Sequence, residues 1–182
     1  MTNFFGTPLV VALALPATLV AQSTGAWDET VRVEVGLGAG VVGEGGGLNA
    51  RVSILVLPSE WGLLVRRTIH DGGEGAETGF IFRFTPKEEF HDAGILLVRV
   101  LGSGSDVRFT VGAGVAGFWG RKILEGSTRL DDFGPVVGIP LEVGLYTVPP
   151  GLVGGGIVLV GNLNSEATQV GFTVTLTFGR WR

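Results

Sequence analysis

Apolar residues alternate with small or polar residues along the segment 170–178, "VGFTVTLTF". The alternation is unbroken, with valine, leucine and phenylalanine at the even positions and glycine or threonine at the odd ones. Successive side chains of a β-strand point to opposite faces of the sheet. The pattern therefore predicts a strand with one apolar face and one face of small, polar residues.

Similar runs recur along the chain, separated by short stretches rich in glycine, proline and acidic residues. No amphipathic helix of useful length is predicted between them. We therefore predict an all-β protein of eight strands. The expected strands cover residues 31–40, 48–57, 61–70, 94–101, 107–119, 136–146, 155–163 and 170–178.

Two positions complicate this pattern. The segment 79–84, "GFIFRF", also alternates, and it is either a further strand, in a barrel of ten, or part of a long connection over 71–93. Pro140 lies in the middle of an expected strand, where it cannot donate a hydrogen bond to its neighbour. We expect a β-bulge at Pro140.

Composition indicates which solvent the apolar faces meet. Hydrophobic residues make up 45% of the chain and charged residues only 16%, against about 25% charged in soluble domains. After residue 21, no apolar run approaches the roughly 18 residues of a membrane helix. The hydrophobic residues are instead dispersed over the strands, which favours strands that face lipid. A soluble β-sandwich or barrel, with its apolar face in the core, is the alternative.

Three features favour lipid. The other face carries glycine, threonine and arginine, which suit a narrow barrel lumen better than a solvated sheet. The expected connections alternate between short (58–60, 102–106 and 147–151) and, on the other side, 43–47, 71–93, 120–133 and 164–168, two of them long and acidic. Amphipathic rings lie at the ends of the runs, as in the aromatic girdles of membrane barrels. These rings are Trp27, Trp61, Trp119, Tyr146 and Trp181.

The pattern resembles the small eight-stranded outer-membrane barrels of the OmpA/OmpX-like type, over roughly residues 28–179. The resemblance implies a closed antiparallel up-and-down transmembrane β-barrel in the bacterial outer membrane, with membrane lipid and the barrel assembly machinery as partners. It also implies an assembly signal in the last strand, formed by Val170, Phe172, Val174, Leu176 and Phe178. Because "GRWR" follows Phe178, either Phe178 or Trp181 is the recognised terminal aromatic residue.

Charged residues fall on the face predicted to line the lumen. An unpaired buried charge is costly, so we expect a network of ion pairs, completed by acids at the strand ends such as Glu29, Glu60 and Asp106. A site for an anionic group, or a narrow anion path, is the alternative. The expected network comprises Arg32, Glu34, Arg51, Arg66, Arg99, Arg108 and Glu142.

Other chemistry is sparse. His70 and His91 are each followed by aspartate but lack further ligands at metal-binding spacing, so we expect solvated loop histidines, no metal and no cofactor. No basic stripe with interleaved aromatic residues indicates nucleic acid. We predict a monomeric, non-enzymatic barrel with a structural or surface-contact role. The alternatives are a barrel that binds or modifies anionic lipid, with a histidine and one of Ser103, Ser105 or Ser127, and a secreted soluble binding protein.

The first residues differ from the rest of the chain. Residues 1–27 carry no charged side chain, and "PLVVALALPATLVA" (8–21) is typical of the apolar core of a secretory signal peptide. We predict a signal peptide over 1–21 and a single barrel domain over 22–182. Because "MTNFFGT" lacks the usual lysine or arginine, a retained membrane anchor is the alternative.

Overall fold

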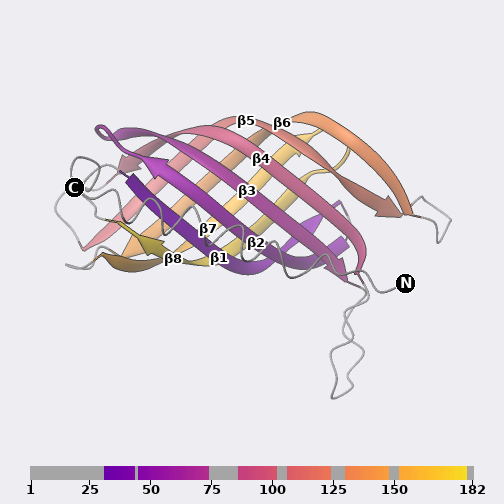
Figure 1. Ribbon diagram of the computed structural model, residues 1–182, viewed down its shortest axis with the longest axis horizontal. Helices are drawn as coiled ribbons and strands as arrows, with labels where there is room; N and C mark the ends of the chain where they lie inside the picture. Colours follow the sequence, from indigo (N-terminus) through magenta and orange to yellow (C-terminus); the bar gives the residue numbers. More distant parts are fainter. Residues whose placement is uncertain are drawn as a thin grey trace, which may run out of the picture.

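The computed structural model describes residues 31–43, 45–73, 86–101, 106–123, 130–147 and 152–179. These residues form eight β-strands (Figure 1). Their bounds are β1 Val31–Val42, β2 Gly45–Val56, β3 Trp61–Gly73, β4 Pro86–Leu101, β5 Val107–Ile123, β6 Leu130–Thr147, β7 Val153–Asn164 and β8 Gln169–Phe178.

The strands form one closed antiparallel barrel. Each strand pairs with the next in sequence, and β8 pairs with β1. Following the paired residues once round the barrel from Val31 leads back to β1 at Val41, a stagger of ten residues (41 minus 31) that requires strongly tilted strands. The predicted eight-stranded antiparallel barrel is confirmed, and the segment 79–84 lies outside the described residues.

The connections divide the barrel into two ends. We call the end where β1 begins and β8 ends the turn end, and it also carries the connections between β2 and β3, β4 and β5, and β6 and β7. The other four connections leave the opposite end, which we call the loop end. This is the division into two sides that the sequence predicts.

The longest strands are β4, β5 and β6. β4, β5 and β6 contain 16, 17 and 18 residues, against 10 in β8 (Figure 1). The connections predicted over 71–93 and 120–133 are therefore too long, because β3 continues to Gly73, β4 begins at Pro86, β5 continues to Ile123 and β6 begins at Leu130. Charged residues assigned to loops, Asp92 among them, belong to strands.

The β-bulge expected at Pro140 is absent. Pro140 pairs with Asn162 in an unshifted register, and the pairing of β5 with β6 has the same offset on both sides of it. The register shifts instead between Phe118 and Gly120, opposite the segment 134–135, "GP". A proline there lacks the backbone donor for a regular ladder.

The outer and inner faces of the strands differ sharply. Outward side chains are apolar and exposed, such as Val137 at 77% and Val174 at 60%. Inside, Leu55, Leu64, Leu96 and Val98 pack together near the turn end. A cluster of Val42, Phe90 and Phe118, with Phe133, Val136 and Ala167 packed against it, lies near the loop end. Between the two clusters the lumen is polar. No helix within the described ranges is long and apolar enough to span a membrane.

Candidate functional site

A chain of alternating positive and negative side chains crosses the lumen. Arg32 contacts Glu34, Glu34 contacts Arg51, and Arg51 contacts Glu142. Glu142 and Asp92 then share Arg66. Three arginines and three carboxylates, contributed by β1, β2, β3, β4 and β6, therefore balance each other, and we call this set the lumen network.

Glu34 is the most heavily bonded carboxylate of the network. It is fully buried, and it accepts hydrogen bonds from Arg32 Nε (2.9 Å) and Arg51 Nη1 (2.6 Å). Ser53 Oγ (3.0 Å) and the Tyr146 hydroxyl (3.1 Å) also donate to Glu34 Oε2. A buried carboxylate needs such donors because it has no water to solvate it.

Arg66 holds the other half of the network. Its Nε lies 3.1 Å from Asp92 Oδ1, and its Nη1 lies 3.4 Å from Glu142 Oε2. The same guanidinium donates to two backbone carbonyls across the barrel, of Leu141 at 3.0 Å and of Gly161 at 2.8 Å. Asp92 in turn accepts a hydrogen bond from the Asn162 side chain. These contacts join β3 and β4 to β6 and β7 through the lumen.

Tyr146 belongs to the lumen, and its predicted place in an aromatic girdle is wrong. The side chain is 2% exposed, and its ring lies 4.0 Å from the Arg32 guanidinium carbon. Glycines make room for the ring, because a Cβ atom at Gly144 or Gly156 would lie 2.4 Å from it. Alternation along β6 supports this placement, since Leu145 points outward.

Arg99 lies on the outer face, so its predicted place in the lumen is also wrong. Its guanidinium carbon lies 5.4 Å from the centre of the exposed Trp61 ring, near the turn end. In β4, Leu96 and Val98 point inward and Ile95 and Leu97 point outward. Both faces of this stretch are apolar, so alternation could not show on which face Arg99 lies.

The remaining expected members of the network fall in different places. Arg108 lies on the lumen side of β5 at the turn end and is half-buried. Glu60 and Asp106, expected to complete the network, are exposed, and Glu29 lies outside the described residues. Asp92, Ser53, Tyr146 and Asn162 take that role instead.

His70 is a lumen residue and not the solvated loop histidine that we expect from the sequence. It is fully buried, its Nδ1 lies 2.7 Å from Asn49 Oδ1, and its ring is tilted against Phe90. The alternation in the sequence already places His70 on the same face as Arg66. The predicted strand ends at His70, whereas β3 continues to Gly73 and keeps this side chain in the lumen.

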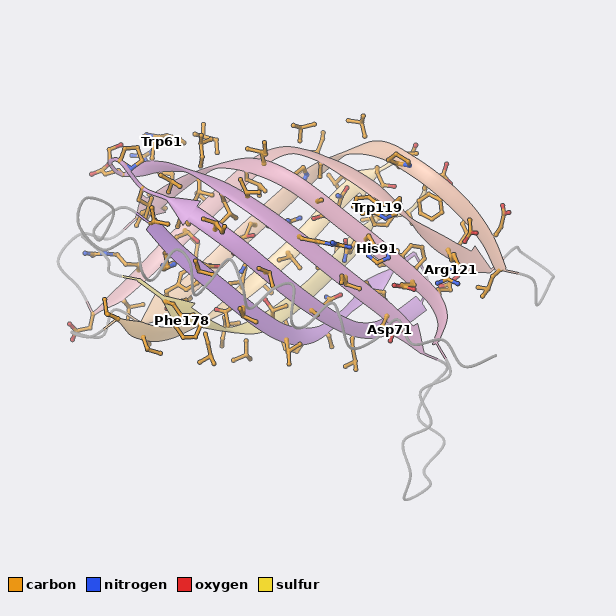
Figure 2. The ribbon with its side chains drawn as sticks, viewed as in Figure 1. Trp61, Asp71, His91, Trp119, Arg121 and Phe178 are labelled. Atoms are coloured by element: carbon orange, nitrogen blue, oxygen red, sulfur yellow. The ribbon has the colours of Figure 1, made fainter. Side chains whose placement is uncertain are left out.

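His91 lies on the outer face near the loop end, within a cluster that we call the rim cluster. Its ring stacks on Trp119 with 5.5 Å between centroids, and its Nε2 lies 3.1 Å from Glu89 Oε1. Arg121 Nη2 lies 3.0 Å from the other oxygen of Glu89 (Figure 2). The rim cluster thus consists of Glu89, His91, Trp119 and Arg121.

Two members of the predicted aromatic girdle lie toward opposite ends of the barrel, Trp61 toward the turn end and Trp119 toward the loop end (Figure 2). That they form a girdle at the membrane interfaces remains a prediction. Trp27 and Trp181 lie outside the described residues. Val170, Phe172, Val174, Leu176 and Phe178 all point outward on β8. Their role as an assembly signal remains a prediction.

The loop end of the lumen is closed by side chains. The rings of Phe90 and Phe118 stack with 5.8 Å between their centroids, and Phe133 packs on both. Above them, Lys122 of β5 contacts Glu166 of the β7–β8 connection at 2.6 Å. No group of three or more metal-ligating side chains occurs within the described residues. Within the described residues, the lumen thus contains paired charges in its middle and packed aromatic rings at the loop end.

Known proteins match this chain in three-dimensional structure but not in sequence. No model of a known protein family matches the chain, and no curated protein matches its sequence. Solved structures do match. Neisserial surface protein A superimposes with a TM-score of 0.64 at 12% identity, over 82% of this chain and 96% of the other. The fold is that of the small outer-membrane barrels.

Two further structures have the same barrel. The N-terminal β-barrel domain of Pseudomonas aeruginosa OprF matches with a TM-score of 0.54 at 12% identity, over 82% of this chain and 98% of the other. Ail, the attachment invasion locus protein of Yersinia pestis, matches with a TM-score of 0.54 at 10% identity, with the same coverage. At sequence identities of 10–12%, this similarity shows a shared fold alone.

Proposed function

We propose that this protein is a monomeric, non-enzymatic outer-membrane β-barrel with a closed lumen, which contributes to the membrane structurally or through contacts at its loop end. The carrying observation is the largely apolar outer face of a closed barrel whose lumen contains paired charges. In water, so large an exposed apolar surface would be strongly unfavourable. In lipid, the closed barrel leaves no unpaired strand edge in the hydrocarbon layer.

The filled lumen supports a structural role over that of a pore. Eight strands leave a lumen that is just wide enough for side chains, and here the lumen network and the aromatic cluster of Phe90, Phe118 and Phe133 occupy it. The three carboxylates of the network already balance its three arginines. An anion that entered would have to displace buried ion pairs.

A lipid-modifying enzyme receives less support. Within the described residues, His70 contacts Asn49 and His91 contacts Glu89, and the hydroxyl of Ser53 donates to Glu34. Ser103, Ser105 and Ser127 lie outside the described residues. We propose membrane lipid and the barrel assembly machinery as partners, with the orientation that places the turn end in the periplasm.

The first test is gel mobility with and without boiling. The expected result is that the detergent-extracted membrane fraction holds the protein and that boiling shifts its band, because a stable closed barrel resists unfolding in the gel buffer. Protein that is soluble without detergent and shows no shift would overturn the proposal.

Conductance tests the closed lumen separately. Reconstituted into planar bilayers, the protein is expected to show no steady ion current. Replacement of Phe118 by alanine serves as a comparison, since it opens the aromatic cluster at the loop end without touching the lumen network. A steady current through the unaltered protein would contradict the closed lumen while leaving the membrane location intact.

A further inference from the structure

Arg67 is out of place on the apolar outer face. It is the seventh of the thirteen residues of β3, and it is exposed between the outward-facing apolar residues Val65 and Ile69. Its cross-strand neighbours are Val52 and Ala93. Between the turn-end level of Arg99 and the rim cluster, it is the only outward-pointing charged residue that the structure describes.

Arg67 differs from its neighbour Arg66 in its contacts. No hydrogen bond or ion pair of Arg67 occurs within the described residues, in contrast to the fully paired Arg66 beside it. An arginine on the lipid face at mid-membrane is among the most unfavourable placements in a barrel. A long cationic side chain avoids that cost when its charged end reaches the polar headgroup layer.

An Arg67 side chain that extends toward the headgroup layer at the loop end would approach the rim cluster. Ile69, two residues closer to the loop end than Arg67, pairs with His91, and His91 pairs with Trp119. In the strand register, Arg67 lies one outward position nearer the turn end than the pair His91–Trp119, and Arg121 lies one outward position nearer the loop end. The two arginines therefore lie on either side, along the strands, of a ring pair of the kind that favours the interfacial level of a bilayer.

Small residues leave space beside this path. Ala93 pairs with Arg67, and Gly117 pairs with Ala93 on the next strand. A Cβ atom at Gly117 would contact only the edge of the Trp119 ring, at 3.9 Å. Between Arg67 and Trp119, the outward positions of the neighbouring strands therefore carry only the small residues Ala93 and Gly117.

We propose that the outer face of β3, β4 and β5 near the loop end binds the phosphate of an anionic lipid, with Arg67 as its principal cationic group and Arg121 as the second. This inference rests on the proposed membrane insertion. His91 and Arg121 contact the two oxygens of Glu89, and Arg121 Nε also lies 3.7 Å from Asp132 Oδ1. Arg67 is therefore the arginine of this surface that no carboxylate within the described residues contacts, which makes it the principal cationic group. Asp71 pairs with Glu89 on the loop-end side of His91 (Figure 2). Because these two acids repel an anion at their own level, we place the phosphate nearer the turn end, beside His91.

The test is native mass spectrometry of the full chain in detergent, titrated with phosphatidylglycerol or with phosphatidylcholine of the same acyl chains. The matched variants are Arg67→Leu and Arg99→Leu, because both arginines point outward on neighbouring strands but lie at different levels. We expect phosphatidylglycerol to bind in preference to phosphatidylcholine. Arg67→Leu is expected to weaken phosphatidylglycerol binding about fivefold, the effect of one cation near a lipid surface, and Arg99→Leu is expected to leave it unchanged.

Four results of the binding titrations would overturn the proposal. These are unchanged binding in Arg67→Leu, an equal loss in Arg99→Leu, equal binding of the two lipids, and full displacement of the lipid by inorganic phosphate, which would show a site for the free anion. A dimer that dissociates on Arg67→Leu, measured by light scattering, would assign Arg67 to a protein interface and would also overturn it. Because both variants should keep the heat-dependent gel shift, failure of the lipid site is distinguishable from failure of membrane insertion.

Discussion

Arg66 and Arg67 are neighbours in β3, but they lie on opposite sides of the barrel wall. Arg66 is 2% exposed and contacts two carboxylates and two backbone carbonyls. Arg67 is exposed among valine, isoleucine and alanine side chains and has no partner within the described residues. The lumen satisfies its own charges, whereas the outer face depends on its surroundings.

This difference follows from the two environments. A buried ion pair is retained when further donors satisfy its remaining lone pairs, and Glu34, with four donor residues, meets that condition. On a lipid face, the barrel can offer such partners only near the rims. Stability should therefore respond in opposite ways when charges are removed from the two sides.

The largest expected effect is that of Glu34→Gln. The substitution removes the buried negative charge that Arg32 and Arg51 both contact, and we expect a loss of about 3–5 kcal/mol in the free energy of unfolding. The measurement is a denaturant titration of refolding in lipid vesicles, followed by tryptophan fluorescence. A loss below about 1 kcal/mol, within the range of exposed pairs, would show that the lumen network is solvated, and the contrast with the outer face would fail.

Arg67→Leu is expected to raise the free energy of unfolding, whereas Glu34→Gln is expected to lower it. In vesicles of zwitterionic lipid the substitution removes a charge from the lipid face, so we expect the free energy of unfolding to rise by about 2 kcal/mol. The same titration in vesicles with anionic lipid should show a smaller gain, because a lipid of net negative charge attracts the guanidinium more strongly than a zwitterionic one does. Destabilisation in both lipids would mean that Arg67 makes a contact within the protein.

A smaller effect is expected where the lumen is crowded. In Gly144→Ala, the new Cβ atom would lie 2.4 Å from the Tyr146 ring and 2.6 Å from Thr110 Oγ1. Because overpacking forces neighbours out of place, we expect a loss of about 1–3 kcal/mol in the same titration. The control is Gly155→Ala, whose Cβ atom would meet only the Thr175 carbonyl oxygen, at 3.5 Å. Equal effects of the two substitutions would argue against a tightly filled lumen.

The smallest effect is expected at the rim cluster. Glu89→Gln weakens contacts with His91 and Arg121, but the Glu89 side chain is 38% exposed and the Arg121 side chain 52%. Exposed ion pairs contribute about 0.2–1 kcal/mol, so the loss should lie in that range. Glu89→Gln and Glu34→Gln make the same chemical change, one at an exposed and one at a buried carboxylate. A loss as large as that of Glu34→Gln would contradict the assignment of Glu89 to a solvated rim.

The sequence alone determined most of the strand content and the two faces of most strands, and it favoured a closed barrel of eight strands over one of ten. It did so because alternation with period two is local, and it is unambiguous wherever one face carries threonine, glycine or arginine, as in β8. The same alternation placed Arg32, Glu34, Arg51, Arg66 and Glu142 on the lumen side, where the structure has them.

Only the tertiary structure decided which of these charges meet and where the strands end. Leu96 and Val98 point into an apolar part of the lumen, so β4 has no polar face to show that Arg99 points outward. Asp92 and His70 appeared to be loop residues, because β3 and β4 continue past their clear alternation and are held there by pairing with each other and with their other neighbours. The contacts of Glu34 with Tyr146, 112 residues away, and of Arg66 with Glu142 arise from barrel closure and stagger, which no local pattern encodes.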